Sequence, residues 1–167
     1  MKSALHIVAQ LVLYVPLMAL IGYFSTRPQF RELAPDEALV RLSFIHAAER
    51  KQACRERSAA ELAKLAPNMR AALDCPRERA PVLVELELDG KVVLQREVPP
   101  AGLQRDGAAI AYFRLPVPAG RHHVVVRLRD TPTGGFNHQG EATLELSPGA
   151  ALTVDFDAAK GDFVFRS

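Results

Sequence analysis

The sequence contains no tryptophan and only two cysteines, and it carries no signature of catalysis or phosphate binding. There is no Gly-x-Ser-x-Gly elbow, no His-Glu-x-x-His pair and no glycine-rich phosphate loop. There is also no Cys-x-x-Cys pair of the kind that binds zinc, exchanges disulfides or attaches haem. We therefore expect a protein that is not an enzyme and that carries no cofactor.

An excess of charge of either sign is also absent. Beyond residue 24 the chain carries 20 Lys and Arg against 19 Asp and Glu. Because nucleic-acid binding requires a concentrated basic surface, we expect no nucleic-acid partner.

Charge is missing altogether from Ala4 to Phe24. As a helix this segment would be about 31 Å long, which matches a hydrocarbon core of about 30 Å. A cleaved signal peptide would have a shorter apolar run followed by a small-x-small site, and residues 21–26 offer none. We therefore predict an N-terminal membrane anchor over residues 1–24, with the lipid bilayer as its partner and a kink at Pro16.

The flanking charges do not decide the orientation of this anchor. Lys2 lies on one side of the anchor, and Arg27 and Arg31 lie on the other. The positive-inside rule therefore hardly discriminates between the two orientations. A short N-terminal tail and a pair of cysteines favour an oxidising compartment for the rest of the chain. We expect a single-pass protein of the inner (plasma) membrane whose C-terminal domain is periplasmic or extracytoplasmic.

Residues 25–79 are predicted to form a juxtamembrane linker and a helical segment. Pro35 suits a first helical position, and apolar residues after it recur at helical spacing, which predicts a helix from Pro35 to about Ala53. A second helix is predicted at Ser58, where Glu61 completes a capping-box pattern. Pro67 is expected to break it.

Cys54 and Cys75 flank this second helical stretch. A straight helix would hold them on the order of 25 Å apart, whereas a disulfide requires Cα atoms within about 7 Å. A disulfide therefore requires the chain to double back near Pro67, and we expect one in an oxidising compartment. The alternative is a soft, copper-type metal site, whose ligands would be His46, Cys54, Met69 and Cys75.

From Pro81 onward the period of the apolar residues changes from helical to strand-like. Seven short strands at roughly 10-residue spacing predict an immunoglobulin-like β-sandwich over residues 80–167. The stretches are 82–88 with its hairpin partner after Lys91, 108–115, 123–129, 141–146, 151–156 and 162–165. The fold expected is mainly β, without the tryptophan and paired strand cysteines of antibody domains.

The first hairpin turns at Asp89-Gly90, and two registers are open. A two-residue turn would pair Leu86 with Val93, whereas a three-residue loop would pair Leu86 with Val92 and keep the apolar side chains on one face. We favour the three-residue loop.

Residues 115–128, with Pro118-Ala119-Gly120 between two apolar runs, resemble the strand–Pro-x-Gly–strand pattern of PEGA and related carbohydrate-binding-like modules. The resemblance implies a β-sandwich and assigns no site. The adjacent His122 and His123 would point to opposite faces of a strand, so they are not expected to share a metal ion.

Two loops are candidates for recognition, because binding residues often lie on loops that a rigid scaffold holds. One loop, residues 99–107, contains Leu103 and Arg105, and the other, residues 130–140, contains Phe136, Asn137 and His138.

The architecture favours an accessory subunit or an assembly and interaction factor of a membrane protein complex, in contact with another membrane or envelope protein. The alternative is a small-ligand or metal-binding module of the cell envelope.

Overall fold

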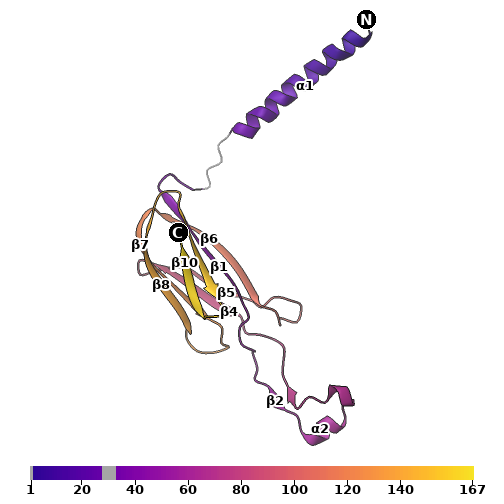
Figure 1. Ribbon diagram of the computed structural model, residues 1–167, viewed down its shortest axis with the longest axis vertical. Helices are drawn as coiled ribbons and strands as arrows, with labels where there is room; N and C mark the ends of the chain where they lie inside the picture. The colour runs from indigo at the N-terminus through magenta and orange to yellow at the C-terminus, as the bar shows by residue number, and fades with distance from the viewer. Residues whose placement is uncertain (1, 28–32) are drawn as a thin grey trace. The chain divides into compact units, whose positions relative to one another are not determined.

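The computed structural model describes residues 2–27 and 33–167, so the linker residues Pro28 and Arg31 lie outside the described residues. The chain divides between Ala34 and Pro35 into two compact units (Figure 1).

The N-terminal unit contains one long helix, α1 (Lys2–Thr26), as the sequence predicts. Its segment Ala4–Thr26 is 23 residues long and apolar enough to cross a bilayer, which requires about 20 such residues. The helix continues through Pro16 without interruption, and its side chains from Ala4 onward are exposed. Thr26 closes the last turn, where its hydroxyl donates to the carbonyl of Gly22 at 3.0 Å.

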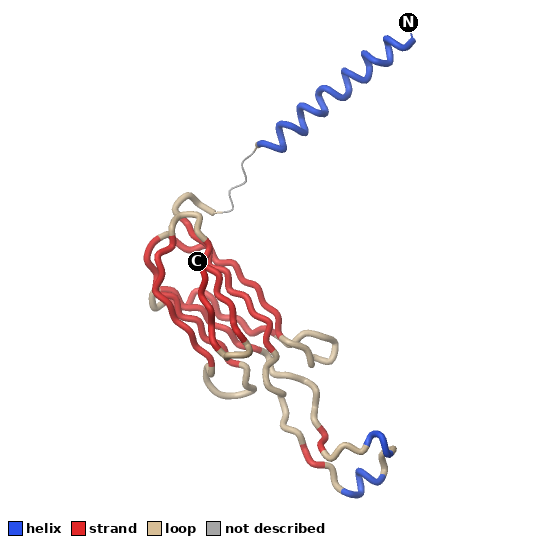
Figure 2. The backbone as a smooth tube through the Cα atoms, in the orientation of Figure 1, coloured by secondary structure: helices blue, strands red, loops and turns tan. Residues whose placement is uncertain are grey.

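The second unit is mainly β and contains two four-stranded sheets within its described residues (Figure 2). One sheet has the order β10-β9-β1-β6 and the other has the order β5-β4-β7-β8. All neighbours are antiparallel except β1 and β9, which are parallel. The strands are β1 (Glu37–His46), β4 (Val82–Leu88), β5 (Lys91–Val98), β6 (Ala109–Pro118), β7 (Gly120–Arg129), β8 (His138–Leu146), β9 (Ala151–Asp157) and β10 (Asp162–Arg166).

Both sheets contribute to one hydrophobic core. Leu42 of β1 and Val154 of β9 are fully buried in it, as are Leu86 of β4 and Leu128 of β7. The alternation predicted for β7 is confirmed on the inner face, because Val124, Val126 and Leu128 all have no exposed surface. Burial of this apolar surface, at roughly 25 cal/mol per Å², is the main stabilisation of the unit.

The helix predicted from Pro35 to Ala53 is wrong, because residues 37–46 form strand β1. Val40, Leu42 and Phe44 alternate with more exposed residues in the two-residue period of a strand. Ile45, which the helical pattern placed on the apolar face, is 66% exposed. Hydrogen bonding to β6 and β9, both distant in sequence, decides the conformation, so β1 belongs to the β domain and not to the linker predicted over residues 25–79.

The three-residue loop predicted for the first hairpin is also wrong. Leu88 pairs with Lys91, so Asp89 and Gly90 form a two-residue turn, and both have the positive φ angles of a type I′ turn, 52° and 80°. A β-bulge then brings Leu94 opposite Leu86. The bulge brings Leu94 to the core side, whereas Val92 and Val93, which the alternation pattern could not assign correctly, are 54% and 41% exposed.

Residues 49–79 lie between β1 and β4 in the sequence and form a projection that we call the arm. It contains β2 (Arg55–Glu56), α2 (Ala59–Ala63), the 3-10 helix η1 (Pro67–Met69) and β3 (Leu73–Asp74). The predicted capping box is present, since the Ser58 side chain accepts from the Glu61 N–H and the Glu61 side chain accepts from the Ser58 N–H. The predicted break at Pro67 is confirmed, because α2 has ended and η1 begins there.

The arm doubles back on itself, and the predicted disulfide between Cys54 and Cys75 is present, with a Cα–Cα distance of 4.2 Å. β2 and β3 pair antiparallel beside it.

Candidate functional site

The arm contributes nothing to the hydrophobic core. All of residues 49–79 are described, and none of them is buried. The arm leaves the β domain at buried Ala48 and returns at buried Ala80, and it extends away from the two sheets (Figure 1). Because the arm buries no side chain, it adds nothing to the hydrophobic stabilisation of the core, and core stability does not explain why the chain contains it.

The base of the arm is fixed to the β domain by hydrogen bonds. The guanidinium of Arg79 donates to the carbonyl of Ala48 at 2.7 Å and to that of Asp106 at 2.9 Å. The Ala80 N–H donates to the Glu49 carbonyl at 2.8 Å. The arm therefore leaves the domain in a defined direction.

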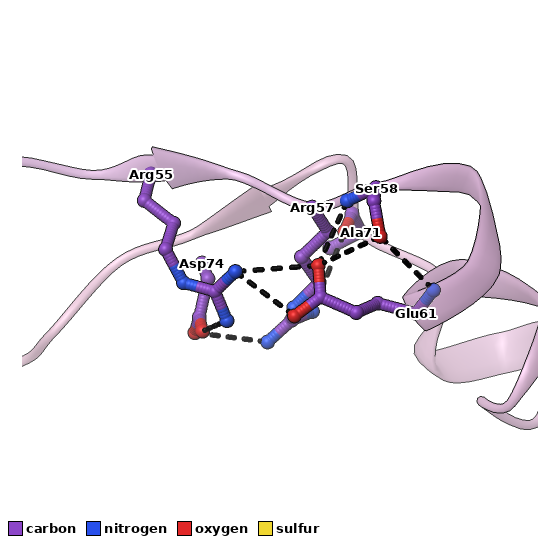
Figure 3. Close-up of polar contacts among 6 residues, drawn as sticks. All are labelled: Arg55, Arg57, Ser58, Glu61, Ala71 and Asp74. Carbon is purple, nitrogen blue, oxygen red and sulfur yellow. Dashed lines mark hydrogen bonds and ion pairs between the residues drawn. The ribbon is translucent and has the colours of Figure 1, made fainter.

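The far part of the arm is held by the disulfide and by a network of charged side chains (Figure 3). Arg55 donates to Glu61 at 2.9 Å and to Asp74 at 3.1 Å, and Arg57 donates to Asp74 at 2.9 Å. Hydrogen bonds from the Ser58 backbone and from Arg55 lower the pKa of Glu61 below its ordinary value. Each exposed ion pair alone contributes little to the free energy of folding. Together with the disulfide, the ion pairs hold the far part of the arm in one conformation.

Two large apolar side chains of the arm face solvent. Met69 is 63% exposed and Leu73 is 52% exposed. The arm is also basic, since residues 49–79 contain eight Lys and Arg against five Asp and Glu. Large apolar side chains that are exposed on a basic projection closed by a disulfide are candidates for contact with another macromolecule.

A second feature is a cluster of His46, Asp130 and His138, which we call the His–Asp cluster. His46 is the last residue of β1, Asp130 follows β7 directly, and His138 is the first residue of β8. Nε2 of His46 lies 2.7 Å from Oδ2 of Asp130, and Nε2 of His138 lies 3.2 Å from the same oxygen. One donor atom from each residue lies within 4.8 Å of the other two.

Neighbouring groups hold the three side chains in place. The Asn137 amide donates to Oδ1 of Asp130 at 2.6 Å, which leaves Oδ2 for the histidines. Nδ1 of His138 lies 3.0 Å from the carbonyl oxygen of Gly161. Phe156 contacts both imidazoles edge-on, with ring centroids 5.0 Å from each.

The electrostatic balance at Asp130 favours the carboxylate. Burial raises the pKa of Asp130, but its polar contacts with His46, Asn137 and His138 outweigh this effect, so the pKa lies below its ordinary value. The side chains of His46, Asp130 and His138 are 13%, 13% and 22% exposed. The cluster therefore presents an anionic oxygen and two imidazoles in a partly desolvated but accessible place.

The copper-type ligand set predicted from the sequence is not brought together. The sulfur atoms of Cys54 and Cys75 are bonded to each other, so neither is available as a thiolate ligand. His46 lies in the His–Asp cluster instead, and Met69 is in η1 at the far part of the arm.

The two predicted recognition loops differ in how far their predicted residues are exposed. In the loop of residues 99–107, Leu103 is fully exposed and Arg105 has a positive φ of 52°. In the other loop, Phe136 is 36% exposed, whereas Asn137 and His138 have structural partners in the His–Asp cluster. Asp130 was not among the functional residues predicted from the sequence, although it directly follows a predicted strand and shares a loop with His138.

His122 and His123 point to opposite sides of β7, as predicted. His122 is buried and contacts Asp89 through Nδ1 at 2.6 Å and the Pro118 carbonyl through Nε2 at 2.8 Å. His123 is exposed, with Glu141 at 3.8 Å.

Comparison with known proteins gives no relative from which a function could be transferred. No protein-family model matches the chain, and no curated protein matches it in sequence. The inferences below therefore rest on the sequence and the structure.

Proposed function

We propose that this chain is a membrane-anchored interaction protein that acts without enzymatic chemistry, as an accessory subunit or assembly factor of a membrane protein complex. In this proposal α1 spans the inner membrane and an immunoglobulin-like sandwich on the extracytoplasmic side carries the arm to its partner. The single observation that supports it best is the arm, which buries no residue although a disulfide closes it.

The disulfide also supports the proposed location, since disulfides persist in oxidising compartments outside the cytoplasm. The partner is expected in the same membrane, because an anchored domain meets membrane neighbours at a high effective concentration. The excess of basic residues on the arm favours a partner whose contact surface is acidic.

Co-purification of arm variants tests the proposal. Full-length protein and the variants Met69→Asp and Leu73→Asp are isolated from native membranes in mild detergent, and companion proteins are quantified by mass spectrometry. A charge in a desolvated contact is costly, so we expect a stoichiometric companion with the wild type and a loss of at least about tenfold with either variant.

Val92→Asp is the matched control, because Val92 is 54% exposed on β5, outside the arm and outside both predicted recognition loops. This variant is expected to retain the companion. A solitary wild-type protein, or a companion that all three variants retain equally, would contradict the proposal.

A further inference from the structure

The His–Asp cluster has the composition of a metal centre. Two imidazole nitrogens and one carboxylate oxygen are a ligand set that zinc and related divalent transition ions accept. The three residues come from different strands and are brought together only by the fold: β1 pairs with β9 in one sheet, whereas β7 and β8 pair in the other.

The distances suit one small ion. Zinc bonds to nitrogen and oxygen at about 2.0–2.2 Å, so two ligand atoms of a tetrahedral site lie about 3.3 Å apart. From Oδ2 of Asp130, the separation of 3.2 Å to Nε2 of His138 matches this value, and that of 2.7 Å to Nε2 of His46 is shorter. All three ligand atoms lie within 4.8 Å of one another. Small side-chain shifts therefore convert the contacts into ligand-to-ligand edges around an ion.

The hydrogen bond of His138 indicates which of its nitrogens is free to ligate. A carbonyl oxygen only accepts, so Nδ1 of His138 donates its proton to Gly161. In the neutral ring Nε2 then carries a lone pair, and it faces the carboxylate oxygen of Asp130. Two lone pairs in contact require a positive charge, which is either a second proton on the imidazole or a cation between them.

The surrounding residues have the roles that orient ligands in metal sites. Histidine ligands usually donate the other ring N–H to a backbone carbonyl or carboxylate, as His138 does to Gly161. Asn137 fixes the carboxylate of Asp130 through Oδ1, and Phe156 packs against both rings. Such preorganisation reduces the ordering that an ion would otherwise impose.

We infer that His46, Asp130 and His138 bind one divalent transition-metal ion of the zinc class, with a fourth coordination position open to water. This goes beyond the proposed interaction function and does not depend on it. The site adjoins the base of the arm, since the Glu49 N–H donates to the backbone carbonyl of Asp130 at 2.9 Å.

Zinc binding to the full-length protein tests the inference directly. The protein is purified in detergent with a histidine-free tag and an intact disulfide, stripped with chelator, and titrated with Zn²⁺ by calorimetry. We expect one Zn²⁺ per chain. His46→Gln and His138→Gln each remove a ligand and are expected to weaken binding by at least about a hundredfold, whereas Asn137→Ala is expected to weaken it by about 10–100-fold.

His123→Gln is the matched control, because His123 is exposed on β7 and lies outside the His–Asp cluster. It is expected to bind Zn²⁺ as the wild type does. A wild type without stoichiometric zinc, or a His138→Gln variant with unchanged affinity, would overturn the inference. The cluster would then be a structural hydrogen-bond network at the ends of the strands.

A measurement on the wild type keeps the test independent of whether the variants fold. Histidine modification by diethyl pyrocarbonate is mapped by mass spectrometry with and without Zn²⁺. Zinc is expected to protect His46 and His138 by about tenfold or more and to leave His123 reactive. Equal reactivity of His46 and His138 in both conditions would equally overturn the inference.

Discussion

At the scale of single residues, His122 and Asp89 form a charged pair beside the first hairpin turn. The hydrogen bond to Asp89 raises the pKa of His122 above its ordinary value. Hydrogen bonds from His122 and from the His123 backbone lower the pKa of Asp89. The His122 contribution to stability is therefore fully present below its unfolded pKa of about 6.5 and is lost as the pH rises through the raised folded pKa.

The opposite sign holds for Asp89. Its contribution is present above its unfolded pKa of about 4 and is lost as the pH falls through the lowered folded pKa. The pair is thus most stabilising in the window between the lowered pKa of Asp89 and the raised pKa of His122.

We predict that His122→Gln lowers the thermal unfolding midpoint most below about pH 6.5 and progressively less as the pH rises through the raised pKa of His122. Unfolding of the two proteins followed by circular dichroism across this range measures the difference. An equal loss at every pH would show that His122 stabilises the domain only through packing.

A second residue-scale prediction concerns Gly140 in β8. A Cβ atom at this position would lie 2.7 Å from Cβ of Phe163, so Gly140→Ala is expected to destabilise the β domain by about 1–3 kcal/mol through overpacking. Urea unfolding measures the change. Gly135→Ala is the control, because an added Cβ there meets nothing within 4 Å, and it is expected to be neutral within about 0.5 kcal/mol.

At the scale of elements, the sequence predicted α1, the capping box, the break at Pro67 and the strands from Val82 onward. These elements depend on local signals such as a long uncharged run, a Ser-x-x-Glu pattern and two-residue alternation. In β7, for example, the inward residues Val124, Val126 and Leu128 could be assigned without knowing which strand lies beside them.

The failures occurred where distant contacts decide the structure. Pro35 and the acidic residues after it resemble a helix start, yet β1 is a strand because β6 and β9 provide its hydrogen bonds. The His–Asp cluster was missed for the same reason, since its residues adjoin only after β1 is placed between those strands. The hairpin register failed because a bulge is not visible in the alternation pattern.

The arm is the element whose behaviour differs most from that of the β domain. Because residues 49–79 bury no side chain, we predict that Cys54→Ser with Cys75→Ser unfolds the arm locally and changes the stability of the β domain by less than about 0.5 kcal/mol. Limited trypsin digestion, with sites such as Arg57 and Arg70, is expected to cleave this variant within the arm faster than the wild type.

The thermal unfolding midpoint of the β domain, measured on the same two samples, is the control for that prediction. A cooperative loss of several kcal/mol would instead match the roughly 3 kcal/mol that a disulfide closing a loop of this length contributes to a whole domain. The arm would then be part of the stability of the fold and not a separate projection.

At the scale of the whole molecule, the chain contains an apolar helix long enough to span a bilayer, a two-sheet β domain and a projecting arm. β1 is about 30 Å long, and its first residue, Glu37, is close to the point where the chain enters the second unit. The His–Asp cluster and the base of the arm lie at the other end of β1, since His46 is its last residue. The candidate binding features are therefore gathered at one end of the β domain.

The central claim is that the arm is the surface that contacts a partner, and crosslinking in native membranes tests it most directly. A photo-reactive amino acid is placed at Met69 in the arm or, as the matched control, at Val92 on β5, and the full-length protein is irradiated in unsolubilised membranes. We predict one discrete crosslinked product, containing a single membrane protein, from position 69 and none from position 92. Absence of a product at 69, or the same product from both positions, would contradict the claim.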